Sequence, residues 1–199
     1  MNIPRIWAWL AVVLLALLLG LGARFVLLPA LEPEPAATGA ALIGGPFSLT
    51  DQTGARRTEA DFRGRHTLIF FGYTFCPDVC PTALQNMTVA LDALGPTAES
   101  ITPVFITIDP ARDTVAALRA FAANFHPRLV ALTGTEDEVR AVAKAYRVYY
   151  AKAGGDGDAD YLVDHTSIIY LMGPDGRYVA HFTHNTTPDE LARALKTYL

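Results

Sequence analysis

The sequence predicts an α/β domain with mainly parallel strands, preceded by one transmembrane helix. Two observations predict the domain: apolar strand-like runs alternate with helical periodicities, and an antiparallel hairpin followed by a helix closes the chain. A third predicts the transmembrane helix, because no charged residue occurs from Ile6 to Ala23.

The apolar N-terminus predicts an uncleaved membrane anchor. A helix needs about 20 apolar residues to cross a bilayer, whereas the core of a signal peptide has about 7–15. No clear A-x-A cleavage site follows directly, so residues 1–28 are predicted as the anchor, with a cleaved signal as the alternative. Residues 29–44, rich in Pro, Ala and Glu, are a predicted tether, and residues 45–199 are the predicted domain.

The charges beside the anchor indicate its orientation. Arg5 and the N-terminus favour a cytoplasmic N-terminus, although Arg24 on the other flank weakens the bias. The domain would then face the periplasm or an equivalent space. Because the N-terminus has no Arg- and Ser-rich amphipathic transit segment, a single pass through a bacterial inner membrane is favoured over the mitochondrial inner membrane.

The first half of the domain shows a hairpin and then alternating strands and helices. Pro46–Thr50 and Arg56–Thr58 flank a turn at Asp51–Gly54. The following elements are a buried strand at Thr67–Tyr73, a helix at Thr82–Leu94, a buried strand at Ile101–Ile108 and a helix from Val115 to Phe125.

The second half continues this alternation and ends antiparallel. The predicted elements are a strand at Leu129–Leu132, a helix opened by the capping box Thr135–Glu138, a strand at Val148–Ala151, a loop at Lys152–Asp160, strands at Thr166–Met172 and Arg177–Phe182, and a helix opened by the capping box Thr187–Glu190. The turn Gly173–Gly176 joins the last two strands. This order predicts a thioredoxin-like fold with an added N-terminal β-hairpin and insertions.

Composition limits the function classes. The chain has 199 residues and a formal net charge of −4, which suits one domain with a full core. Nucleic acid is excluded as a partner, because phosphate binding needs clustered Lys and Arg.

The two cysteines of the chain are the first candidate functional residues. Cys76 and Cys80 follow the Thr67–Tyr73 strand, where sites form in open α/β sheets. A helix N-terminus beside them lowers the pKa of a thiol and favours the thiolate. This spacing permits a disulfide, a redox dithiol or a metal site, but two thiolates alone make an incomplete site for copper or zinc.

A histidine could complete a metal site. Of five histidines, structural or surface roles are predicted for four, which are His66, His126, His181 and His184. His165 differs because it lies between a glycine-rich loop and a buried strand, with Asp164 beside it as a candidate to support the ligand. A lone histidine before a strand is, nevertheless, more often structural.

Together these motifs resemble the Sco/SenC proteins, membrane-anchored copper chaperones for cytochrome c oxidase assembly. The resemblance covers roughly Gly44 to Leu199 and rests on five stretches: Gly72–Pro81, Asp109–Thr114, Ala145–Tyr150, Tyr161–Thr166 and Gly173–Gly176. C-P-D-x-C-P with a distant D-H-[ST] is specific, whereas a bare C-x-x-x-C would be weak. The family's fold is thioredoxin-like.

The resemblance implies that Cys76, Cys80 and His165 bind one copper ion, as Cu(I) or Cu(II). Asp164 would then tune the site, and Asp78 is expected either to support the ligands or to have a structural role. The implied function is delivery of copper to the binuclear copper site of an oxidase subunit, with another periplasmic copper chaperone and a thiol reductant as possible partners. Motion of the Lys152–Asp160 loop would let His165 release copper before the two cysteines do, which would open the site.

Several rival functions remain open at this stage. In a thiol–disulfide oxidoreductase, Cys76 would attack a target disulfide and Cys80 would resolve it, although the usual C-x-x-C spacing is absent. Peroxidase or redox-sensor activity and zinc binding are weaker options. A Cys76–Cys80 disulfide would be the oxidised form of the same site, to be reduced before metal loading.

Overall fold

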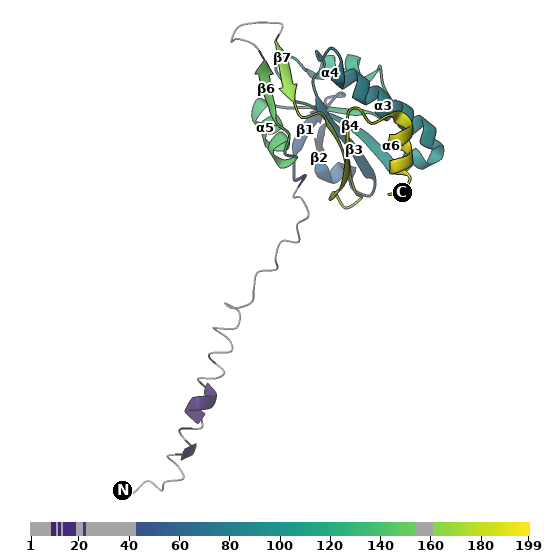
Figure 1. Ribbon diagram of the computed structural model, residues 1–199. Coiled ribbons are helices and arrows are strands. Elements are labelled where there is room, and N and C mark those ends of the chain that lie inside the picture. The colour runs from purple at the N-terminus through teal and green to yellow at the C-terminus, as the bar shows by residue number, and fades with distance from the viewer. Residues whose placement is uncertain (1–8, 11, 13, 19–21, 23–42, 154–160) are drawn as a thin grey trace. The chain divides into compact units, whose positions relative to one another are not determined.

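The computed structural model describes residues 9–10, 12, 14–18, 22, 43–153 and 161–199 (Figure 1). The chain divides into two compact units, Met1–Ala40 and Ala41–Leu199. Most of the predicted anchor (1–28), the tether up to residue 42 and residues 154–160 of the predicted loop lie outside the described residues. Among the residues that are described, we find no helix with the length and hydropathy needed to cross a membrane.

A seven-stranded sheet forms the centre of the second unit. Its order is β2-β1-β5-β4-β3-β8-β9. The strands are β1 (Ser48–Asp51), β2 (Arg56–Thr58), β3 (His66–Gly72), β4 (Ile101–Thr107), β5 (Val130–Thr133), β8 (Ile168–Met172) and β9 (Tyr178–Thr183). Strands β3, β4 and β5 run parallel, and β1, β8 and β9 pair antiparallel with their neighbours. This arrangement confirms the predicted α/β architecture with an added N-terminal hairpin.

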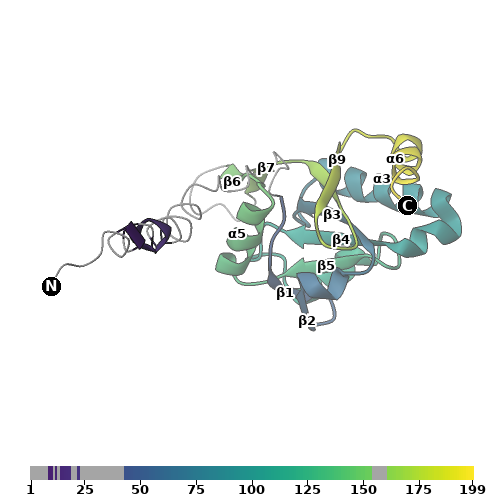
Figure 2. The same cartoon turned by 90° about the horizontal axis from the view of Figure 1, so that it is seen from below.

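Among the described residues of this unit, four helices cover the sheet. They are α3 (Val79–Leu94), α4 (Val115–Ala122), α5 (Glu136–Ala145) and α6 (Pro188–Leu195), with short 3-10 helices at Glu59–Phe62 and Gly95–Ser100. Figures 1 and 2 show α3 and α6 side by side on one flank of the sheet and α5 on the opposite flank. Both predicted capping boxes are confirmed at the starts of α5 and α6, where they satisfy amide donors that the helix leaves free.

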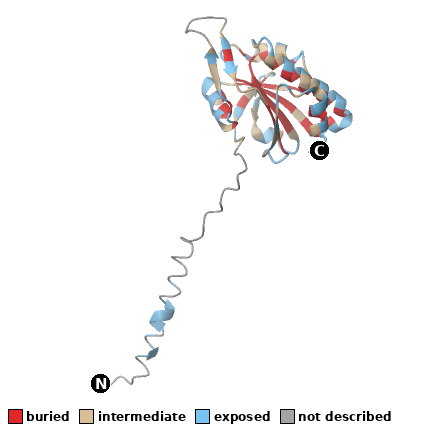
Figure 3. Cartoon of the chain, in the orientation of Figure 1, coloured by how far each residue is buried: buried red, intermediate tan, exposed pale blue. Residues whose placement is uncertain are grey.

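The core lies between these layers, and the central strands form its middle (Figure 3). Every residue of β3 after His66 is buried, as its continuous apolar run predicts for a strand covered on both faces. Phe70 and Phe105 are opposite each other in the β3–β4 ladder, and both are fully buried. The carboxyl end of β3 is therefore a rigid base for the cysteine loop that follows it.

The predicted strand at Val148–Ala151 is wrong in position and partner. The structure has β6 at Tyr150–Ala153, which pairs antiparallel with β7 (Leu162–His165) and not with the seven-stranded sheet. The residues of β6 are half-buried or exposed, so this strand lacks the apolar faces that a central position needs. Arg147 precedes it with φ at 58°, a left-handed turn that ends the α5 segment.

Strand β7 was not predicted, and the prediction placed His165 in a connecting segment. The structure places His165 at the last position of β7, in register with Tyr150. Helix α3 also begins at Val79, before the predicted start at Thr82, so that Cys80 lies in its first turn. Pro81 is tolerated there because the first amides of a helix have no intrahelical acceptor.

Candidate metal centre

The cysteine loop connects the carboxyl end of β3 to the first turn of α3. Cys80 points into the core and is fully buried, whereas Cys76 is half-buried in the loop. The Cys80 sulfur packs against Gly72, where a Cβ atom would lie only 2.7 Å from Sγ. Glycine is therefore needed at the end of β3 to admit the sulfur.

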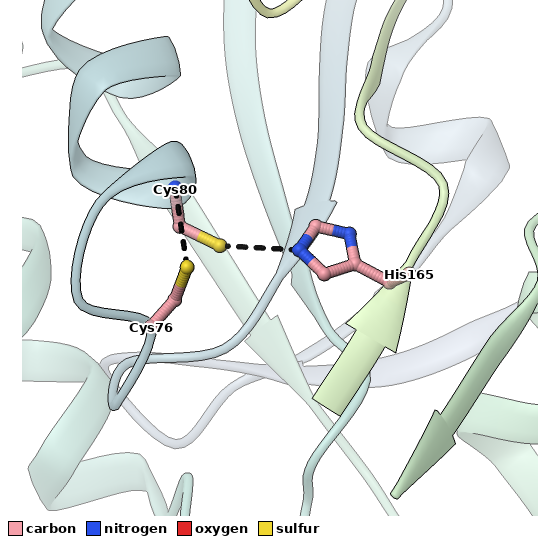
Figure 4. Close-up of side chains that lie close together, drawn as sticks. All are labelled: Cys76, Cys80 and His165. Carbon is pink, nitrogen blue, oxygen red and sulfur yellow. Dashed lines mark hydrogen bonds between the residues drawn. The ribbon is translucent and has the colours of Figure 1, made fainter. Parts of the chain in front are cut away.

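Three side chains from two distant parts of the sequence converge beside this loop. The ligand atoms of Cys76, Cys80 and His165 all lie within 4.8 Å of one another. The Cys80 sulfur lies 3.5 Å from Nε2 of His165 (Figure 4). Within the described part of the chain, no other group of three histidine, cysteine or acidic side chains is placed to hold a metal ion.

The orientation of His165 leaves Nε2 facing the sulfurs. Its Nδ1 lies 3.0 Å from the carbonyl oxygen of Thr166. Because a carbonyl only accepts, Nδ1 donates in this bond, and Nε2 is the ring nitrogen that is left to bind a metal ion. The rings of Phe70 and Tyr73 contact the imidazole nearly edge to face, with centroids 6.1 and 6.0 Å away. The imidazole is thus oriented as a metal ligand requires.

The two sulfurs differ in protonation. A hydrogen bond from the Cys80 thiol and the amide N–H of Cys80, 3.4 Å away, hold the pKa of Cys76 at about 3. The Cys76 thiolate and burial raise the pKa of Cys80 far above its usual range. The pair therefore carries one negative charge and one proton, and binding a metal through both sulfurs would displace that proton.

Two thiolates and one imidazole suit copper. Soft sulfur ligands select Cu(I), and the imidazole suits copper in either oxidation state. In this structure both cysteines are free thiols, so the predicted disulfide is not formed.

The carboxylates of the two predicted supporting aspartates make no hydrogen bond to a sulfur or to the imidazole among the described residues, whereas the backbone N–H of Asp78 donates to the Cys76 sulfur. Asp164 is exposed on β7, and the imidazole is oriented by the Thr166 carbonyl instead. Asp78 is exposed at the start of α3, where its backbone carbonyl accepts from the Thr82 amide and its carboxylate from the Thr82 hydroxyl.

The four other histidines lie outside this group. His126 follows α4 and accepts the amide N–H of Arg128, in agreement with its predicted structural role. His181 is exposed on β9 and is hydrogen-bonded to Tyr178. His66 opens β3, and His184 follows β9.

A buried aspartate anchors the cysteine loop, and sequence analysis did not assign it this role. The carboxylate of Asp113, fully buried, accepts hydrogen bonds from the amide and hydroxyl of Thr74 and from the Thr107 hydroxyl. Burial raises the pKa of Asp113, and the hydrogen bonds oppose that rise. Thr114, and not Asp113, caps α4, which leaves the Asp113 carboxylate free to hold the loop.

Comparisons with known proteins identify relatives of the chain. A family model described as SCO1/SenC matches residues 35–199. The mitochondrial SCO1 homologue of Homo sapiens is 48% identical over 163 residues, which cover 81% of this chain and 54% of that protein. An SCO2-like protein of Rickettsia felis is 39% identical over 193 residues, covering 93% of this chain and 94% of the relative. The chain therefore spans about half the length of the human protein.

Solved structures match the fold as well. The structure of Bradyrhizobium japonicum ScoI with copper bound is 48% identical, with a TM-score of 0.73, and the match covers 79% of this chain and 99% of that chain. The predicted thioredoxin-like α/β fold is the fold of this solved relative.

Proposed function

The chain belongs to the SCO1/SenC family, and from that premise we propose that it carries one copper ion bound by Cys76, Cys80 and His165. The observation that carries the proposal is the convergence of these three side chains, since they come from two separate elements and present two sulfurs and one imidazole to one point. A relative whose structure contains copper, matched over nearly all of its length, supports the same metal.

Delivery to cytochrome c oxidase is the second part of the proposal. The expected receiver is the binuclear copper site of an oxidase subunit, and the further expected partners are another periplasmic copper chaperone and a thiol reductant. Cys76 and His165 are only half-buried, so an incoming ligand can approach copper from the surface. Three-coordinate copper leaves room for ligand exchange of this kind.

Location at a membrane is the third part. We propose that residues 1–28 anchor the chain, residues 29–44 act as a tether, and residues 45–199 form the copper-binding domain. The uncharged run from Ile6 to Ala23 supports the anchor, and a bacterial relative supports a bacterial setting. In that setting the anchor would cross the inner membrane once and the domain would face the periplasm.

A titration of the reduced full-length chain with Cu(I) and then Cu(II) tests copper binding. We expect one copper per chain for the natural protein and a large loss of copper retention for His165→Ala. His181→Ala is the matched control, because it removes an exposed histidine outside the site. Unchanged copper affinity in His165→Ala would contradict the assignment of this ligand.

The asymmetry of the two cysteines favours thiol–disulfide exchange as a second candidate function. The Cys76 thiolate is partly accessible and would attack a target disulfide, releasing one target thiolate. The Cys80 sulfur would then attack the mixed disulfide, forming Cys76–Cys80 and releasing the second target thiol. Two electrons pass to the target, which could be the cysteines of the oxidase subunit or a redox-signalling protein.

The same variant separates the two candidates. His165→Ala keeps both cysteines, so it should retain thiol–disulfide exchange with a model disulfide while losing copper. If His165→Ala abolished exchange and left copper retention intact, the order of the two candidates would be reversed.

A further inference from the structure

The strand that carries His165 is attached to the rest of the domain by few contacts. In the described part of the chain, β6 and β7 pair only with each other and extend past the carboxyl ends of the central strands (Figure 1). The position of the imidazole over the cysteines must therefore be set by side-chain contacts to the neighbouring loops.

One group of side chains supplies such contacts. The Tyr161 hydroxyl, one residue before β7, donates to the Asp109 carboxylate at 2.6 Å. The same carboxylate accepts Nε of Arg112 in an ion pair. Asp109 is 3% exposed and the Arg112 side chain 14%, so both interactions are largely shielded from water.

The Arg112 guanidinium also stacks between the two parts of the site. Its central carbon lies 3.6 Å from the centroid of the Tyr161 ring on the hairpin side. It lies 4.7 Å from the ring of Phe75, the residue before Cys76. A guanidinium over aromatic faces is attracted by the ring electrons, and more strongly where water is excluded.

We propose that Arg112 is a positioning residue that clamps the β6–β7 hairpin, and with it His165, against the cysteine loop. The proposal rests on the proposed copper site, but it concerns a residue that would not touch copper. With the clamp intact, the imidazole is held ready to bind. When the clamp is broken, the hairpin moves away more often and His165 leaves copper sooner.

One atom of Arg112 makes the closed arrangement less favourable. One guanidinium nitrogen of Arg112, Nη2, is buried and has no hydrogen-bond partner among the described residues. A buried donor without a partner opposes the closed arrangement. Contact with a receiving protein could therefore open the clamp without breaking a fully satisfied network.

Arg112→Gln in the reduced full-length chain tests the clamp. Loss of a shielded cation–aromatic stack should weaken Cu(I) retention by about threefold to thirtyfold and speed release to a chelator by a similar factor. Arg177→Gln, an exposed arginine in the β8–β9 turn, is the matched control and should change neither. Equal retention and release for Arg112→Gln and the natural chain would overturn the clamp.

Two further variants distinguish the stacking of Arg112 from its charge, and the hydroxyl of Tyr161 from its ring. Arg112→Lys keeps the charge but not the planar stack, so it should behave like Arg112→Gln; full retention in Arg112→Lys would overturn the proposal. Tyr161→Phe keeps the ring and removes only the hydroxyl, and should speed copper release by about twofold to tenfold.

A double variant shows whether Arg112 acts through His165. In a His165→Ala background, Arg112→Gln should cause no further loss of copper, because the residue that it positions is gone. A full additional loss in that background would mean that Arg112 acts on the cysteines or the fold, and the proposal would be wrong. If His165→Ala itself retained copper normally, the proposed ligand set would fail instead, which is a different result.

Discussion

Replacing Tyr73 by Phe should loosen the hairpin that carries His165 while leaving the main sheet intact. The Tyr73 side chain is 2% exposed, and its hydroxyl accepts the amide N–H of Val163 at 3.2 Å. Val163 lies two residues before His165 on β7. The substitution keeps the aromatic ring against the imidazole and removes the hydroxyl that accepts the Val163 amide and that also bonds the Cys76 side chain.

The structure sets the size of the effect. Val163 is 5% exposed, so its amide would be left buried without a partner, at a cost of about 1–3 kcal/mol. Because β6 and β7 do not pair with the seven-stranded sheet, the cost falls on the docking of the hairpin. At about 1.4 kcal/mol per factor of ten, the hairpin should open roughly 5 to 150 times more often.

Hydrogen exchange of backbone amides measures this opening directly. We expect faster exchange in Tyr73→Phe for β7 and for the Thr166 amide, which bonds to the Tyr149 carbonyl, with β3 unchanged. Tyr178→Phe is the matched control, since it removes the hydroxyl of a half-buried tyrosine on β9 that bonds His181 and lies outside the hairpin. Uniformly faster exchange in β3, or unchanged exchange in β7, would refute the reasoning that one hydroxyl tethers the hairpin.

Three further predictions concern single groups. Burial raises the pKa of Asp51, but hydrogen bonds from Thr53 and Arg57 outweigh burial and lower that pKa from 3.8 to about 2. The ionised Asp51 carboxylate therefore contributes up to about 2.5 kcal/mol to the free energy of unfolding. This contribution is present above pH 4 and is lost as the pH falls through 2. In urea unfolding, the free energy of unfolding of Asp51→Asn should therefore be lower than that of the natural chain at pH 7 and should converge with it at pH 2. Alkylation of Cys76 should proceed at a nearly constant rate between pH 8 and 5, because its pKa is about 3; a tenfold fall per pH unit would contradict the thiolate. Gly72→Ala should weaken copper binding, measured by chelator competition, because its Cβ would lie 2.7 Å from the Cys80 sulfur; normal affinity would show that the sulfur can move.

The central elements could be predicted from the sequence because their signals are local. The apolar run of β3, the two capping boxes and the glycine-rich turn at Gly173–Gly176 each specify an element through nearby residues. The cysteine loop could be placed for the same reason, since it follows directly after the apolar run of β3.

The β6–β7 hairpin could not be predicted, because it forms by pairing of two weak strands. No residue of β6 is buried and Val163 is the one buried residue of β7, which is too weak an alternation to mark either strand.

The supporting contacts of the site were missed for a related reason. Arg112, Asp113 and Tyr73 act through partners far away in the sequence, and only the folded chain brings them together.

X-ray absorption of the copper-loaded full-length chain tests the account's central claim most directly. If Cys76, Cys80 and His165 hold the ion, each copper should have two sulfur neighbours and one nitrogen neighbour from an imidazole. His165→Ala should lose the imidazole signal, and His181→Ala should keep it. A copper environment of oxygen and nitrogen alone, or one unchanged by His165→Ala, would contradict the claim that these three residues form the site.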